Sequence, residues 1–170
     1  MNIPALERYL KSFGSQIIKQ AKGNLVAAGK GGALANSIDF FVIKKGGSVT
    51  LRFKMAAYGK FVDKGVSGNK VTRTFTDRKG KTQTSPFKYT TKQPPSGIIE
   101  KWIKRKGLKG RDKKGRFITH KSLSFLIARS IKSKGIQGIS FFQKPLMIGM
   151  KEFGGKFGTA IKEDILNSIK

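Results

Sequence analysis

An apolar stripe near the start of the chain is the feature that most constrains the fold. Apolar residues recur at three- and four-residue steps along residues 3–28, the spacing that places side chains on one face of an α-helix. The lysines fall mainly off this stripe, and the glycines of residues 29–32 end it. The sequence therefore predicts a long amphipathic helix with one buried face. The stripe consists of Leu6, Leu10, Phe13, Ile17, Ala21 and Leu25.

A β-hairpin is predicted next. Residues 38–43 are apolar apart from Asp39, residues 44–47 form a glycine-containing turn, and residues 49–54 alternate between apolar and basic or polar side chains. Alternation with a period of two is typical of a strand with one buried face.

A short helix with one buried face is expected after the hairpin, ended by Gly65 and Gly68, since helices commonly end at a glycine. The residues that recur at helical steps are Tyr58, Phe61, Val62 and Val66.

Residues 69–95 have the character of an insert. Residues 71–76 alternate, residues 77–80 are a turn signal, and residues 81–84 return as a second strand. The apolar content is too low for a core, so we expect a projecting hairpin or long loop. In a free subunit this insert is expected to be extended or disordered, and to become ordered against a neighbour.

Three further helices are predicted in the second half. Ser96 and Ser122 are expected N-caps, Trp102 is an expected packing anchor, and Pro145 suits the first turn of the last helix. The last helix contains four glycines, which predict either close packing against another helix or subunit, or a break near residues 154–155. The predicted fold class is α+β: an antiparallel sheet packed against the long N-terminal helix and the C-terminal helices. The expected core includes Leu10, Phe13, Ile17, Leu51, Phe53, Trp102, Leu126, Ile127 and Phe157.

The charge balance points to an anionic partner. The chain has 170 residues with 36 Lys and Arg against 9 Asp and Glu, a net charge of +27. Such a charge predicts attraction to DNA, RNA or an acidic protein surface. There are no cysteines, so no disulfide or thiolate metal site is expected. No secretion signal and no apolar run of membrane-spanning length is visible, so a soluble protein of a cell, or of a particle assembled there, is expected.

Catalytic chemistry is not predicted. His120 is the only histidine, so a histidine-based triad or metal cluster cannot form within one chain. Glu163 and Asp164 are adjacent and point in different directions on a helix. The glycine-lysine run of residues 29–32 does not match a phosphate-binding loop. We expect no catalytic residue, no metal, no cofactor and no small-molecule substrate.

Positive charge is densest along residues 101–121, where Asp112 is the only acid. Gly107, Gly110 and Gly115 are expected to keep the middle of this basic loop, at about residues 104–121, flexible. One interpretation is a solvated loop, and the other is contact with phosphate or with an acidic neighbour. The expected contact residues are Lys104, Arg105, Lys109, Arg111, Lys113, Lys114 and Arg116.

Three motifs stand in a fixed order along the chain. G-x-L-x-x-S-I covers residues 32–38, Y-G-x-(F/Y)-V-(D/E)-x-G covers residues 58–65, and a Phe-Phe/Pro-Leu box covers residues 141–146. With the long first helix and the two strands, this order resembles the small head–tail connector, or tail-completion, neck proteins of tailed bacteriophages. Asp63, where that family more often has Glu, and the long insert depart from the pattern.

The resemblance implies a single domain of residues 1–170 that assembles as a sixfold or twelvefold ring in the virion, after synthesis in the host cytoplasm. The implied partners are portal, adaptor or tail proteins and, without sequence specificity, packaged DNA. The rival classes are a basic nucleic-acid-binding accessory protein and a toxin or nuclease; the absence of a catalytic constellation argues against the last. The expected subunit-interface residues are Tyr58, Phe61, Asp63, Phe75 and Phe87.

Overall fold

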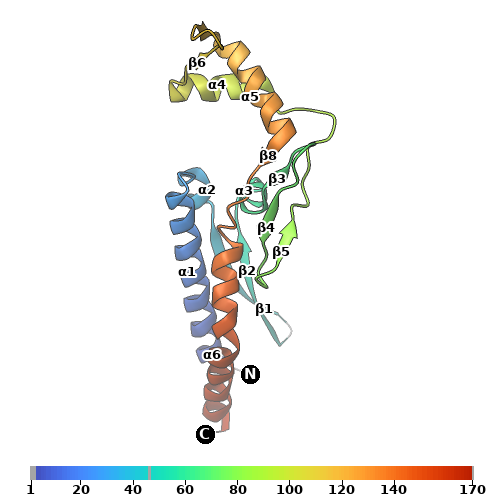
Figure 1. Ribbon diagram of the computed structural model, residues 1–170. Helices are drawn as coiled ribbons and strands as arrows, with labels where there is room; N and C mark the ends of the chain where they lie inside the picture. Colours follow the sequence, from blue (N-terminus) through green and yellow to red (C-terminus); the bar gives the residue numbers. More distant parts are fainter. Residues whose placement is uncertain (1–2, 46, 170) are drawn as a thin grey trace. The chain divides into compact units, whose positions relative to one another are not determined.

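The computed structural model describes residues 3–45 and 47–169 and has the predicted α+β class (Figure 1). Contacts divide the chain into two compact units. The first unit comprises Met1–Asp63, Thr76–Gln83 and Ile139–Lys170, and the second comprises Lys64–Phe75 and Thr84–Gly138. Each unit is described by itself below.

The first unit is built from two long helices and a hairpin. Helix α1 (Pro4–Ala27) lies beside helix α6 (Gln143–Ile169), as Figure 1 shows. The short helix α2 (Ala33–Asn36) leads into strands β1 (Asp39–Lys45) and β2 (Ser48–Lys54), which pair antiparallel. Helix α3 (Gly59–Lys64) follows. The predicted N-terminal helix, hairpin and last helix are confirmed, and α6 is continuous through residues 154–155.

The core of the first unit is centred on the stripe of α1. All six stripe residues are buried, and the Phe13 ring meets the Phe153 ring edge-on with centroids 5.1 Å apart. Leu51 and Phe53 of β2 and Phe157 of α6 are half-buried. They line an apolar groove of about 670 Å³ between α1, β2 and α6.

Close helix packing explains one of the four glycines of α6. A Cβ atom at Gly149 would lie 2.8 Å from Cδ1 of Ile17 and 2.9 Å from Cε2 of Phe13. A Cβ atom at Gly154, Gly155 or Gly158 would meet nothing within 4 Å. The expected close approach is therefore present at Gly149 alone.

The second unit is helical with small two-stranded sheets. Strand β3 (Val66–Ser67) pairs with β8 (Gly135–Ile136). Strand β4 (Thr74–Thr76) pairs with β5 (Thr82–Thr84) in a hairpin whose residues Thr76–Gln83 belong to the first unit. Helix α4 (Ser96–Lys106) packs against α5 (His120–Lys134), and β6 (Gly110–Arg111) and β7 (Phe117–Ile118) form a hairpin between them.

The buried face of α4 and α5 differs from the predicted one. Trp102 is 39% exposed and Leu126 is 52% exposed, so neither is core. Ile103 and Ala128 are fully buried, and Ile127 is half-buried. Each helix has a broad apolar stripe, but two helices that pack on each other cover only a narrow line of it. Trp102 and Ile127, together with Ile98, line an open groove.

The helix caps lie one to three residues before their predicted positions. Pro95 is the N-cap of α4, and Ser96 is its first helical residue. The hydroxyl of Thr119 caps α5 by accepting a hydrogen bond from the backbone N of Ser122, at 3.1 Å. Ser122 is therefore the donor partner of the cap.

The insert forms its predicted hairpin, and residues of the insert make polar contacts with other segments. Ser85 is 7% exposed, and its hydroxyl donates to the carbonyl oxygen of Gly65 at 2.8 Å. Nε of Arg73 donates to the carbonyl oxygen of Lys134 at 2.8 Å. Polar contacts thus hold the insert in place, although its apolar content is too low for a core. The number of apolar residues alone does not predict these contacts.

Candidate functional site

The carboxylate of Asp63 joins two of the three sequence motifs. Asp63 is 3% exposed, and its Oδ1 accepts hydrogen bonds from the backbone N of Phe142 at 2.9 Å and of Gln143 at 3.4 Å. These donors belong to the start of α6, whose first N–H groups have no partner within the helix. A carboxylate there also interacts favourably with the helix dipole. Asp63 is therefore a buried cap and, contrary to expectation, not a surface contact.

Two aromatic residues at the start of α3 lie outward: Tyr58, just before the helix, and Phe61, within it. Tyr58 is 47% exposed and Phe61 is 40% exposed, so the predicted burial of these two rings is wrong. Gly59 faces the core instead, where a Cβ atom would lie 2.8 Å from Sδ of Met55 and 3.1 Å from Cδ1 of Leu34. The helix docks through its smallest residue and its capping acid, and the two rings lie on the surface of the first unit.

The other two predicted interface residues lie in the second unit. Phe75 is half-buried, with Nζ of Lys64 5.6 Å from its ring centroid. Phe87 is half-buried, and its carbonyl oxygen accepts a hydrogen bond from the backbone N of Ser67 at 2.7 Å. The structure therefore offers Tyr58 and Phe61 as exposed aromatic residues and gives Phe75 and Phe87 contacts within their own unit.

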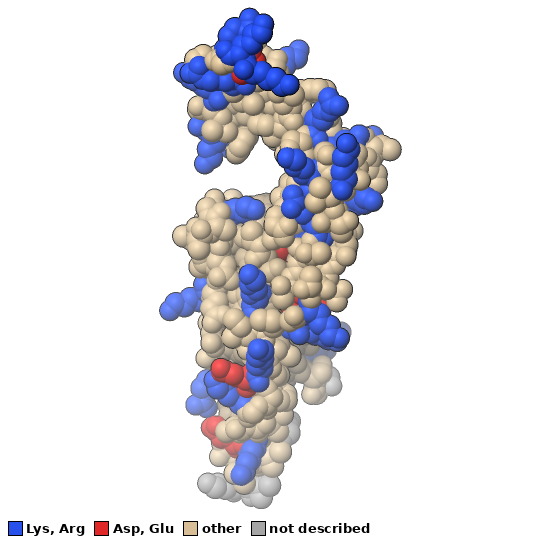
Figure 2. Space-filling view, in the orientation of Figure 1, with Lys and Arg blue, Asp and Glu red and all other residues tan. Residues whose placement is uncertain are grey.

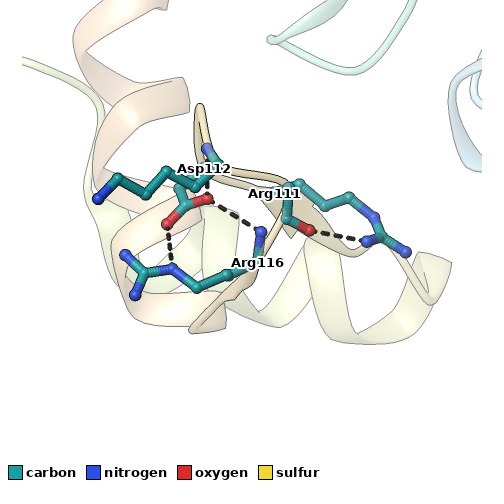
Figure 3. Close-up of polar contacts among 5 residues, drawn as sticks. Arg111, Asp112 and Arg116 are labelled. Carbon is teal, nitrogen blue, oxygen red and sulfur yellow. Dashed lines mark hydrogen bonds and ion pairs between the residues drawn. The ribbon is translucent and has the colours of Figure 1, made fainter.

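The basic segment is a folded hairpin, which corrects the expected flexible loop. Oδ1 of Asp112 accepts hydrogen bonds from the backbone N of Lys114 and of Arg116, both at 2.9 Å. Oδ2 of Asp112 accepts from Nε of Arg116 at 3.0 Å (Figure 3). These backbone and side-chain hydrogen bonds hold the pKa of Asp112 below its ordinary value. The carboxylate thus organises a turn that presents the neighbouring basic side chains.

An aromatic ring supports part of this basic surface. The guanidinium Cζ of Arg111 lies 4.0 Å from the ring centroid of Phe117, and Nζ of Lys109 lies 5.7 Å from it. Arg111 also donates from Nη1 to the carbonyl oxygen of Gly115 at 2.7 Å. Cations over a ring face are held by its quadrupole. The ring of Phe117, which is 60% exposed, therefore keeps Arg111 against the hairpin.

Five of the seven predicted contact residues lie on or beside this hairpin, and two lie on α4. Nζ of Lys104 pairs with Glu100 at 2.9 Å, whereas Arg105 lines the apolar groove of about 680 Å³ between α4 and α5. Figure 2 shows Lys and Arg side chains gathered over α4 and the β6–β7 hairpin. The hairpin residues are Lys109, Arg111, Lys113, Lys114 and Arg116.

Every one of the nine acids has a partner within the chain. Asp63 and Asp164 cap helices, Asp77 and Asp112 order turns, and Asp39 accepts from the backbone N of Phe40. The four glutamates form ion pairs with lysines or arginines. The net charge of +27 already counts these nine acids, so further neutralisation must come from outside the chain.

Within residues 3–45 and 47–169, no group of three or more His, Asp or Glu side chains is placed to hold a metal ion. Among the described helices, none is long and apolar enough to cross a membrane. Comparison of the chain with protein-family models, with curated proteins and with solved structures found no match.

Proposed function

We propose that this protein is a structural component of a tailed-phage neck, in which copies form a ring that joins the portal vertex to the tail. The observation that carries the proposal is the contact between Asp63 and Phe142. Two motifs on which the resemblance rests are 79 residues apart in sequence and are joined by a buried hydrogen bond. Because the two motifs contact each other in one structural unit, we treat them as parts of one family pattern.

The exposed rings of Tyr58, just before α3, and of Phe61, in α3, are the proposed subunit contact. Tyr58 and Phe61 lie on a turn that is fixed by the buried cap and by Gly59. Aromatic residues on a rigid surface are common anchors of protein interfaces. In a ring, this surface would meet a different surface of the next copy, because ring interfaces are heterologous.

The net charge of the subunits determines the conditions under which the ring closes. Copies with a net charge of +27 repel one another, and the acids are already engaged within each chain. We therefore expect a monomer or weak oligomer in isolation, and a closed ring only on an acidic partner or around DNA.

The test combines light scattering with particle analysis. Purified protein should scatter as a monomer or weak oligomer, and particles of the phage that encodes it should contain it as a ring in the neck. Tyr58→Ala and Phe61→Ala should reduce incorporation without a matching loss of monomer stability. Phe125→Ala is the control, because Phe125 is also an exposed aromatic residue, at 50%, but lies in the second unit. Particles that lack the chain, or hold it as isolated copies, would refute the proposal.

A nucleic-acid-binding accessory protein is the second candidate, favoured by the unneutralised charge. The two proposals differ in salt dependence and in location. An accessory protein should bind nucleic acid at physiological salt, with a steep decrease in affinity as salt rises, and should be absent from purified particles.

A further inference from the structure

The chain contains the same basic turn twice. Asp77-Arg-Lys-Gly-Lys81 lies between β4 and β5, and Asp112-Lys-Lys-Gly-Arg116 lies between β6 and β7. We call these the first tip and the second tip. The first tip lies in the first unit and the second tip lies in the second unit.

The two tips also share their hydrogen bonds. In the first tip, Oδ1 of Asp77 accepts from the backbone N of Lys79 at 2.8 Å and of Lys81 at 2.9 Å. These bonds are equivalent to those of Asp112 in the second tip. In both tips the backbone N of the glycine donates to the carbonyl oxygen of the aspartate at 3.0 Å. Gly80 and Gly115 both have φ +79°, a conformation that side chains disfavour.

Turn formation accounts for only part of this repeated sequence. The geometry requires an aspartate at the first position and a glycine at the fourth. The second and third positions carry no such requirement, yet both are Lys or Arg in both tips, in a chain where these types make up 36 of 170 residues. The fifth position is also basic in both tips, and in the second tip Nε of Arg116 donates to Oδ2 of Asp112 at 3.0 Å. The repeated basic side chains therefore need an explanation other than folding.

We propose that both tips bind the phosphate backbone of duplex DNA. Residues 78–81 and 113–116 are all exposed and include no apolar side chain. Protein interfaces are centred on apolar and aromatic anchors, whereas phosphate contacts need only cations and N–H donors. A duplex also offers the same anionic group repeatedly, which suits a chain that carries the same basic turn twice. This inference does not depend on ring formation.

The aspartate is what makes each tip a defined contact. Oδ1 of each aspartate is occupied by backbone N–H groups, so it orders the turn that carries the basic side chains. Figure 3 shows the second tip, where Nε of Arg116 also donates to Oδ2 of Asp112. Charge and turn geometry can therefore be tested separately.

The charge test uses full-length protein, a fluorescein-labelled duplex of about 20 base pairs, long enough to offer several phosphates to each tip, and fluorescence anisotropy over a range of NaCl concentrations. One variant carries Arg78→Gln, Lys79→Gln and Lys81→Gln, and the other carries Lys113→Gln, Lys114→Gln and Arg116→Gln. A control variant removes the same charge from exposed positions of α1 and α6 and the loop after α1: Lys19→Gln, Lys30→Gln and Lys162→Gln.

Each tip variant should lower the slope of log affinity against log salt by about 0.9 for every phosphate that it no longer neutralises, up to about 2.7. The control should lower the slope by less than about 0.9. Tip variants that match the control would overturn the proposal, because the tips would then be no more than solvated charges.

The geometry test keeps the charge constant. Gly80→Ala and Gly115→Ala disturb turns that need a positive φ, and each should weaken duplex binding while Gly155→Ala, in an open position of α6, should not. Polyglutamate binding should respond to the tip substitutions no more than to the control substitutions. A greater loss of polyglutamate binding than of duplex binding would assign the tips to an acidic polypeptide and overturn the proposal.

Discussion

Asp164, near the end of α6, caps the first turn of α1 through the backbone N of Ala5. Oδ1 of Asp164 lies 2.9 Å from that nitrogen, although the two residues are 159 positions apart in sequence. Oδ2 of the same carboxylate lies 2.9 Å from the backbone N of Leu6. Helix α1 has no side-chain cap of its own. The two longest helices are thus joined by a cap as well as by apolar contacts.

Replacing Asp164 should destabilise the first unit. Asp164→Ala leaves two buried N–H donors without a partner, and we expect a decrease of about 2 kcal/mol in the free energy of unfolding. Urea unfolding followed by circular dichroism measures the decrease. Glu163→Ala is the matched control: its side chain is 54% exposed and lies 3.9 Å from Arg8, so a change within about 0.5 kcal/mol is expected. Equal decreases for the two variants would contradict the capping role.

Two glycine-to-alanine substitutions in α6 should change the stability of the protein in opposite directions. Gly149→Ala places a Cβ atom 2.8 Å from Ile17, and such overpacking costs about 1–3 kcal/mol. Gly155→Ala meets nothing within 4 Å and should stabilise the helix by about 0.5–1 kcal/mol. Thermal unfolding of both variants checks the prediction, and a destabilised Gly155→Ala would show that this face of α6 is covered.

Alanine substitutions at two neighbouring residues of α4 should differ sharply in how much they lower the free energy of unfolding. Ile103→Ala empties a fully buried site and should cost about 2–5 kcal/mol. Trp102→Ala removes a ring that is 39% exposed in the groove, and its cost should be smaller than that of Ile103→Ala. Circular dichroism is the suitable probe, since Trp102 is the only tryptophan. A larger decrease in the free energy of unfolding for Trp102→Ala than for Ile103→Ala would show that Trp102 is the packing anchor.

Protonation of Asp77 and Asp112 at low pH should remove the hydrogen bonds that order both basic turns, in the same pH range. Backbone hydrogen bonds, chiefly from Lys81 and from Arg116, hold the pKa of Asp77 and of Asp112 below the ordinary value. A lowered pKa means that the stabilisation is complete above the ordinary Asp pKa of about 3.9 and is lost as pH falls through the lowered value.

NMR titration of the two carboxyl carbons should therefore give midpoints below about 3.9, with the amide shifts of Lys79 and Lys114 following them. Asp77→Asn and Asp112→Asn should each abolish the corresponding titration. A midpoint above the ordinary value would mean that the carboxylate does not accept these hydrogen bonds.

The sequence by itself determined the elements whose signals are local. The stripe of α1 and the alternation of β2 each repeat within one segment, so the period alone indicates the structure and the buried face of the helix. The turn at residues 77–80 is predictable in the same way, because aspartate and glycine act on their own backbone.

For other residues, only the tertiary structure decided which apolar and charged side chains are buried. Trp102 and Leu126 lie on correctly predicted helices, but burial depends on how much of a stripe the partner helix covers. Asp63 and Asp164 are buried although aspartate is a residue type that is mostly exposed. They are buried because each meets the unpaired N–H groups of a distant helix, a match that requires both partners to be in place.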